Sequence, residues 1–154
     1  MAVKPIPEGY HSITPYLVVR DAEKELAFLT KAFGAVPTHP PHKRPDGKIM
    51  HAEMKIGDSR VMLGEATEEW PPTANSLYLY VPDVDATYKH ALAAGAQSTM
   101  EPMDQFYGDR SGGVMDPNGN IWWIATHKED VSADEMQRRT EEHLKQQKAK
   151  GKAA

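Results

Sequence analysis

Apolar and polar residues repeat along this chain in one order that occurs twice. Each copy runs from an apolar strand end through one residue and an aspartate into a one-sided helical stretch, and then to Gly-Ala. Asp21 and Asp83, 62 residues apart, occupy the N-cap position, where a carboxylate accepts the first free amide hydrogens of a helix. Gly34 and Gly95 occupy the C-cap position, where a left-handed backbone ends the helix. The two copies are VVRDAEKELAFLTKAFGA (18–35) and YVPDVDATYKHALAAGA (80–96).

Strand-like runs with turn residues between them flank both predicted helices. One run precedes each helix and three follow it, so the order β-α-β-β-β is written twice. The sequence therefore predicts the α+β fold class, with modules at about 10–66 and 74–126 inside one domain of residues 1–127. The expected strands are 12–19, 36–38, 49–56 and 60–65 in the first module, and 76–81, 98–103, 111–115 and 121–125 in the second.

The last segment, residues 128–154, has a different character. Ser132 and Glu135 have the spacing of a capping box, which predicts that a helix starts there. Beyond Met136 the only bulky apolar residue is Leu144, so this helix can bury little and is expected to fade into a solvated tail.

Composition narrows the function classes. Lys and Arg number 18 against 22 Asp and Glu, so the formal charge is -4 and no basic field is available for nucleic acid. The chain has no cysteine, so a metal would need His, Asp or Glu ligands. The N-terminal segment lacks a signal-peptide core, and nowhere do about 18 apolar residues follow one another. We therefore expect a cytoplasmic protein with a small-molecule ligand and no nucleic-acid or membrane partner.

Three stretches in this order, YLVVRDAEKELAFLTKAFGA, YVPDVDATYKHALAAGA and GVMDPNGNIWWIA, resemble the vicinal oxygen chelate superfamily. This superfamily groups glyoxalase I, extradiol dioxygenases, fosfomycin-modifying enzymes and bleomycin-binding resistance proteins. HAEMKIGDSRVMLGE and DPNGNIWWIATHKEDVSADEM are similar to its PhnB-like, glyoxalase-related branch. The resemblance spans about residues 10–136. It implies two βαβββ modules whose curled mixed sheets surround a concave pocket, and it implies a homodimer.

The resemblance also implies a divalent metal at the pocket centre, held by side chains from the first and last strands of each module. Only one of the four corresponding positions keeps a carboxylate, and the others offer hydroxyl or indole groups, which hold a dication poorly. We therefore expect no metal cofactor, with Glu65 as a weak candidate ligand and a divalent metal at a shifted site as the alternative. The four positions are Thr14, Glu65, Ser76 and Trp123.

Strand alternation predicts which side chains line the pocket. Trp123 is expected to face the pocket and Trp122 the core, because neighbours on a strand point to opposite faces. Tyr107 and Arg110 lie on a Gly-rich approach to a strand, where an Arg can reach an anionic or carbonyl-bearing ligand. The other predicted pocket residues are Tyr16, Val18, Tyr78, Tyr80 and Met103, and the predicted helix-facing residues are Ile13, Leu17, Val19, Leu77, Leu79 and Val81.

The run IMHAEMKIG alternates in the same way. Met50, Ala52, Met54 and Ile56 form an apolar face, and His51, Glu53 and Lys55 form the other face. If the apolar face packs under the first helix, His51 and Glu53 project into the concavity. They could then act as a general base with its orienting partner, or as two ligands of a different metal site. A solvated polar face is the alternative. The spacing of the other histidines, His127 included, indicates no chemistry.

Three functions follow from these features. The first is a glyoxalase/bleomycin-resistance-like protein that binds a small, partly aromatic or apolar molecule by stacking. The second is a glyoxalase-like lyase or isomerase that acts next to a carbonyl, with His51 and Glu53 as acid-base groups or non-standard metal ligands. The third is a subunit that binds a protein partner through its C-terminal helix.

Overall fold

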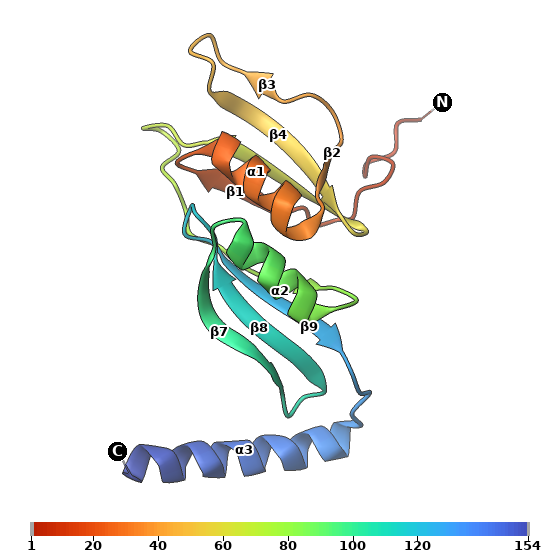
Figure 1. Ribbon diagram of the computed structural model, residues 1–154. Helices are drawn as coiled ribbons and strands as arrows, with labels where there is room; N and C mark the ends of the chain where they lie inside the picture. The colour runs from red at the N-terminus through yellow and green to blue at the C-terminus, as the bar shows by residue number, and fades with distance from the viewer. Residues whose placement is uncertain (1, 154) are drawn as a thin grey trace.

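Two sheets and three helices make up the structure (Figure 1), a computed structural model that describes residues 2–153. The helices α1 and α2 lie side by side over one face of the two sheets, and α3 stands apart from them. The helices are α1 (Ala22–Phe33), α2 (Val84–Ala93) and α3 (Ala133–Ala153). The strands are β1 (Tyr16–Val19), β2 (Val36–Pro37), β3 (His42–Lys43), β4 (Ile49–Ile56), β5 (Ser59–Glu65), β6 (Ser76–Tyr80), β7 (Gln97–Asp104), β8 (Asp109–Met115) and β9 (Ile121–His127).

The sheet topology confirms the predicted fold class. The first sheet has the order β1-β5-β4-β2, with the short β3 also paired to β4, and the second has the order β6-β9-β8-β7. In both sheets the first strand of the module pairs in parallel with the last, and the remaining pairs are antiparallel. Each sheet with its helix is therefore one βαβββ module, to which the first module adds the two-residue strand β3.

The predicted helix caps are present. Asp21 and Asp83 each accept a hydrogen bond from the backbone N–H three residues further on, at 3.0 and 3.1 Å. Gly34 ends α1 in the left-handed conformation, with φ of 65°. The second helix differs, because Ala94 caps it in the right-handed conformation and Gly95 follows one residue later. The N-cap pair therefore fixes the start of both helices.

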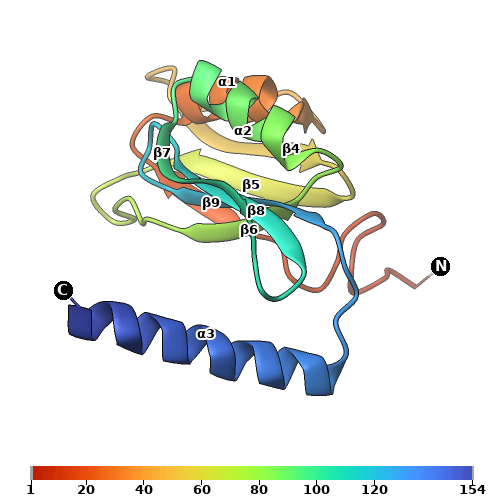
Figure 2. The ribbon, with the colours of Figure 1, turned by 60° about the horizontal axis from the view of Figure 1, so that its bottom comes forward.

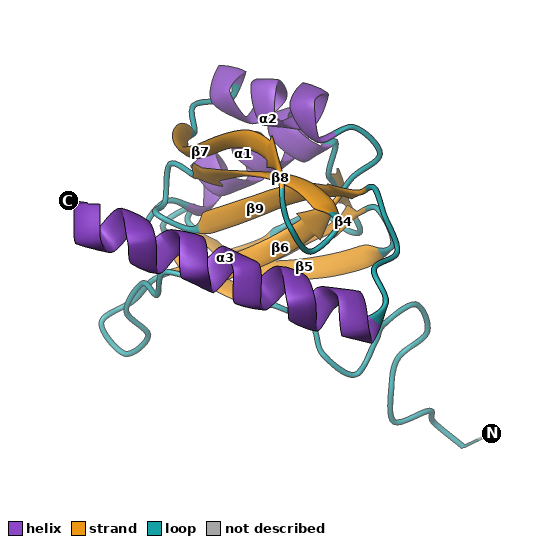
Figure 3. Cartoon of the chain, turned by 90° about the horizontal axis from the view of Figure 1, so that it is seen from below, coloured by secondary structure: helices purple, strands orange, loops and turns teal. Residues whose placement is uncertain are grey.

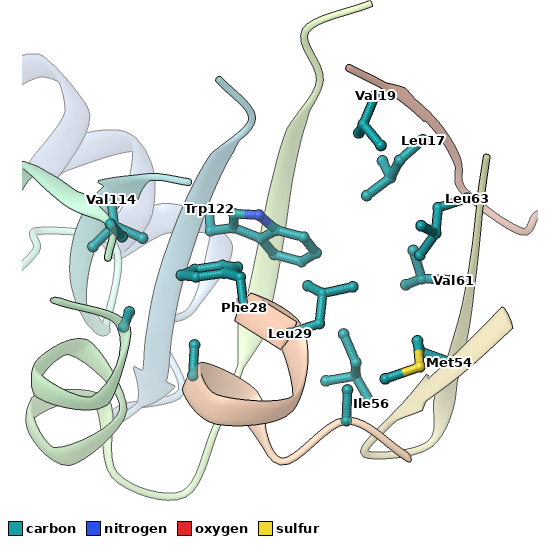
Figure 4. Close-up of a cluster of buried hydrophobic side chains, with 14 of the residues drawn as sticks. Leu17, Val19, Phe28, Leu29, Met54, Ile56, Val61, Leu63, Val114 and Trp122 are labelled. Atoms are coloured by element: carbon teal, nitrogen blue, oxygen red, sulfur yellow. The ribbon is translucent and has the colours of Figure 1, made fainter. Parts of the chain in front are cut away.

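One hydrophobic core runs through both modules (Figure 4). Trp122 from β9 is 2% exposed, and its ring lies beside Phe28 and Phe33 of α1, with centroids 4.9 Å apart for Phe33 and Trp122. Leu17 of β1 is buried as expected, whereas Ile13 is 86% exposed because β1 begins only at residue 16. The predicted helix-facing position of Ile13 is therefore wrong.

A register shift changes one face of β4. Opposite β3, the pairing jumps from His51 to Ile49, so Met50 is left out of the ladder. Ile49 is buried and Met50 is 56% exposed, which places Met50 on the open face and corrects its predicted place on the apolar face. From Ala52 to Ile56 the predicted alternation holds on the helix-facing side.

The turn before β9 ties the second module to the first. Asn118 donates from Nδ2 to the backbone oxygen of Asp21 and to Oε2 of Glu25, both at 2.9 Å. Its Oδ1 accepts the Asp21 N–H at 3.0 Å. Asp116 accepts the indole N–H of Trp122 at 2.9 Å and the backbone N–H of Asn118. The turn thus holds the start of α1 and the central core tryptophan together.

The C-terminal helix extends further than the sequence predicts. Glu135 N–H donates to Ser132 Oγ at 3.3 Å, as expected for the capping box, but α3 continues to Ala153. It lies on the side of the sheets opposite to α1 and α2 (Figures 2 and 3). Arg139 and His143 hold it against Phe106 and Glu129. Within residues 2–153, no helix combines the length and apolarity needed to cross a membrane.

The buried Glu25 should make the free energy of unfolding depend on pH. Burial first, and then the neighbouring Asp116, raises the pKa of Glu25 from 4.5 to about 9. Between these values the folded chain keeps a proton that the unfolded chain releases, so the free energy of unfolding falls as pH rises, by at most about 1.4 kcal/mol per pH unit. We expect Glu25→Gln to flatten this decline between about pH 5 and pH 9 in urea unfolding. Equal slopes in both proteins would contradict this, and Glu23→Gln on the exposed side of α1 is the control.

Candidate functional site

Three aromatic residues form the open face of the second sheet. Tyr78 and Tyr80 come from β6, and Trp123 comes from β9 directly opposite Tyr78 in the parallel register. Tyr78 and Tyr80 are 44% and 61% exposed, while the alternating Leu77 and Leu79 pack against the core. The predicted division of β6 into an aromatic face and an aliphatic face is therefore observed.

A buried carboxylate anchors both tyrosines. Asp109 of β8 is 4% exposed, and its Oδ2 accepts the hydroxyl groups of Tyr78 and Tyr80 at 2.8 and 2.9 Å. Its Oδ1 pairs with Nδ1 of His127 at 2.8 Å, and Nε2 of His127 pairs with Asp130 at 2.8 Å. Asp109 and His127 were missed by the sequence analysis, although both belong to this network.

The network fixes protonation states. Burial, and then contacts with Tyr107 and Asp109, raise the pKa of Tyr78, and the hydrogen bond to Asp109 raises the pKa of Tyr80. Burial disfavours the charge of Asp109, but hydrogen bonds from His127 and the two tyrosines outweigh it and lower its pKa. The phenols therefore stay protonated, and their oxygens offer lone pairs to a ligand.

Trp123 is held in one orientation. Its indole N–H donates to Ser76 Oγ at 3.1 Å. Its six-membered ring lies over Gly113, where a Cβ atom would approach Cζ3 of the indole to 2.8 Å, so only glycine leaves room. The indole is therefore fixed from below by Gly113 and at its edge by Ser76.

Tyr107 and Arg110 have partners within the chain. The Tyr107 hydroxyl lies 3.4 Å from Ser111 Oγ, beside the Asp109 network. Arg110 donates from Nε and Nη2 to Asp85 at 2.9 and 3.0 Å, and from Nη1 to Asp104 at 3.3 Å. Two carboxylates thus compensate the charge of Arg110, which argues against its predicted contact with an anionic ligand.

The first sheet also has an open face. Tyr16, Met50 and Trp70 are 45%, 56% and 67% exposed. They line a hollow of about 390 Å³, together with Val18, Arg44, Gly64, Glu65 and Thr67. The Tyr16 hydroxyl lies 3.2 Å from Nδ1 of His51. Tyr16 and Tyr78 line different hollows, because Tyr78 borders a cleft of about 270 Å³ that also includes Thr14.

Glu53 is covered by other side chains. It is 1% exposed and accepts hydrogen bonds from the Tyr10 hydroxyl, from Thr38 at 2.8 Å and from Arg60 at 2.7 Å. Burial opposes its charge, but these donors lower its pKa, so Glu53 stays a carboxylate. Burial first, and then His39, lower the pKa of His51. Only His51 of this predicted pair is partly open to solvent.

The family metal position does not fit its residues. Met62 of β5 pairs with Tyr16, and Trp123 of β9 pairs with Tyr78. Met62 is therefore the residue of the first module that corresponds to Trp123. The predicted correspondence between Glu65 and Trp123 is wrong. Glu65 lies on the same side of β5 as the buried Leu63, and it caps α1 by accepting the Ala22 N–H at 2.8 Å. Ser76 is bonded to the Trp123 indole. Hydroxyl, thioether and indole groups do not form a site for a hard or borderline dication.

A family model matches most of the chain. The family described as "Glyoxalase/Bleomycin resistance protein/Dioxygenase superfamily" matches residues 9–124. The matched span covers the first module and the second module as far as the middle of β9.

Curated relatives at 36% identity come from mycobacteria. One is an uncharacterized protein of Mycobacterium tuberculosis strain H37Rv, which aligns over 137 residues, 82% of this chain and 80% of that protein. Another is an uncharacterized protein of Mycobacterium bovis, with the same identity and length of alignment and 90% of its own length covered.

Solved structures share the fold. TioX from Micromonospora sp. ML1 superposes with a TM-score of 0.66 at 24% identity, over 76% of this chain and 98% of that one. A glyoxalase-related enzyme from Fulvimarina pelagi gives 0.61 at 19% identity, over 80% and 94%. A glyoxalase/bleomycin resistance protein/dioxygenase from Nocardioides gives 0.58 at 19% identity, over 86% and 90%.

Titration of His127 should report the Asp109 network. The hydrogen bond to Asp109, and then that to Asp130, raise the pKa of His127 above its ordinary 6.5. We expect Asp109→Asn to return this pKa toward 6.5, measured from the imidazole proton shifts by NMR. Asp134→Asn, on α3, serves as the control. An unchanged pKa of His127 in Asp109→Asn would show that the pair does not form in solution.

Proposed function

We propose that this chain, which belongs to the Glyoxalase/Bleomycin resistance protein/Dioxygenase superfamily, binds a small planar molecule on the aromatic face of its second sheet. The observation that carries this proposal is the pairing of a fixed, partly open indole with two anchored phenols. Trp123 is held by Ser76 and Gly113, and Tyr78 and Tyr80 are held by Asp109. Rigid aromatic groups stack on a ligand with little loss of side-chain entropy.

The polar groups restrict the chemistry of the ligand. The phenol hydrogens of Tyr78 and Tyr80 are directed to Asp109, so their oxygens accept hydrogen bonds from a ligand. Arg110 is occupied by Asp85 and Asp104. The face therefore favours a neutral, partly aromatic molecule with a hydroxyl or amine donor over an anion. This binding mode needs no metal at the family position.

A homodimer would complete the pocket. One chain leaves both sheets open, with Tyr16, Met50 and Trp70 on the first and Tyr80 and Met103 on the second. Exposed apolar patches of this kind mark interaction surfaces. We infer that the first-module face of one copy covers the second-module face of another, which would enclose the ligand between them.

Catalysis is the second candidate, and His51 supports it. The lowered pKa of His51 keeps its imidazole neutral, as a general base requires, and Tyr16 contacts Nδ1. Glu53 would stabilise the protonated imidazole through its charge, because one of its oxygens lies within 4.8 Å of a ring nitrogen of His51. A lyase or isomerase activity next to a carbonyl should then be lost in His51→Ala and in Glu53→Gln. Unchanged turnover in His51→Ala would contradict it.

Binding of 2-naphthol, a planar probe with one hydroxyl donor, tests the proposed ligand class. We expect calorimetry to show saturable binding that weakens at least about tenfold in Trp123→Ala, since one stacked aromatic contact contributes about 1 kcal/mol or more beside its buried area. Leu144→Ala, which removes an exposed apolar side chain from α3, should bind as the wild type does. Equal affinities in wild type and Trp123→Ala would place the ligand elsewhere.

A further inference from the structure

Three imidazole rings gather at the far edge of the first sheet. His39 lies in the segment between β2 and β3, His42 lies in β3, and His51 lies in β4 opposite His42. The ring centroids of His39 and His42 are 5.2 Å apart, and those of His39 and His51 are 5.9 Å apart. No part of the proposed ligand face requires histidines at this edge.

Glu53 completes the cluster. One ligand atom each from His39, His51 and Glu53 lies within 4.8 Å of the others. We propose that these three side chains bind one borderline divalent cation, such as Zn²⁺, Co²⁺ or Ni²⁺. The site is separate from the family metal position, and it does not rest on the proposed small-molecule function.

The imidazoles are prepared for coordination. Nδ1 of His39 lies 3.0 Å from the carbonyl oxygen of Pro40, which can only accept a hydrogen bond. Nδ1 therefore carries the hydrogen, and Nε2 keeps its lone pair for a metal. Nδ1 of His51 lies 3.2 Å from the Tyr16 hydroxyl, which can accept its hydrogen. In the tautomer with that hydrogen on Nδ1, Nε2 has the free lone pair and is the ligand atom. Histidines that bind metals usually have their second nitrogen held in this way.

Glu53 retains room for a metal bond. A carboxylate has about four lone-pair sites, and Tyr10, Thr38 and Arg60 occupy three of them. The same donors keep Glu53 ionised despite its burial, so the negative charge that a cation needs is already present.

The donor set selects the metal. Two nitrogen ligands and one carboxylate oxygen suit zinc, cobalt and nickel, whereas magnesium and calcium prefer oxygen ligands. Bonds to zinc of about 2.0–2.2 Å require the three atoms to draw closer than 4.8 Å. His39 lies in a segment outside the strands and can supply that movement, and His42 or water can take the fourth position.

Calorimetric titration of the full, untagged and chelator-treated protein with zinc chloride tests the site. We expect about one equivalent to bind, with cobalt giving visible absorption bands of a coordinated ion. His39→Ala and His51→Ala should each weaken zinc binding at least about tenfold. His39→Ala removes only a partly exposed side chain, so its unchanged melting without metal checks that the fold is intact.

Two matched variants locate the ion. His90→Ala removes an exposed histidine of α2, and Glu65→Gln removes the charge of the carboxylate that caps α1. Both variants should bind zinc as the wild type does. Lack of zinc binding up to about 1 mM would overturn the proposal. So would full affinity in His39→Ala and His51→Ala, or loss of binding in Glu65→Gln alone.

Discussion

The arrangement of the two modules depends on the hydrogen bonds that the side chain of Asp116 accepts. This side chain accepts the indole N–H of Trp122 and the backbone N–H groups of Asn118 and Asn120. Through Asn118 the same turn holds the first residue before α1, so one carboxylate orders the turn, the core and the contact between the modules. The protonated Glu25 beside it is the cost of placing two carboxyl groups in one buried site.

The position of Trp122 sets the position of the ligand face. Because neighbouring residues of a strand point to opposite faces, an indole fixed in the core at Trp122 sends Trp123 to the open side of the sheet. The antiparallel partner strand β8 then supplies Gly113 beneath Trp123 and Asp109 beneath the two tyrosines. The pairing of β9 with β6 and β8 therefore places a rigid aromatic surface on the open side of the sheet, opposite the core contact of Trp122. Such a surface favours binding by stacking.

Much of this could be predicted from the sequence, because local signals determine it. The aspartate caps fixed both helices, and alternation separated Trp122 from Trp123. The pairing of Asp109 with His127 could also have been predicted. Counting outward from the Asp-Pro-Asn-Gly turn along β8 and β9 places the two residues opposite each other.

Other features depend on contacts between distant segments and could not be read locally. The unpaired Met50 arises from the pairing of β4 with β3, and Glu53 is covered by Tyr10, 43 residues away in the chain. The length of α3 was underestimated because side-chain pairs along its surface, such as Gln137 with Glu141, support a helix that buries little apolar area.

The central claim is that Trp123, and not another tryptophan, stacks on a planar ligand. Fluorine NMR of the chain labelled with 5-fluorotryptophan tests this directly, since Trp70, Trp122 and Trp123 are its three tryptophans. On addition of 2-naphthol, the Trp123 resonance, assigned from Trp123→Phe, should move and saturate while that of the buried Trp122 stays in place. A Trp123 resonance that does not respond, or a response confined to Trp70, would contradict the claim.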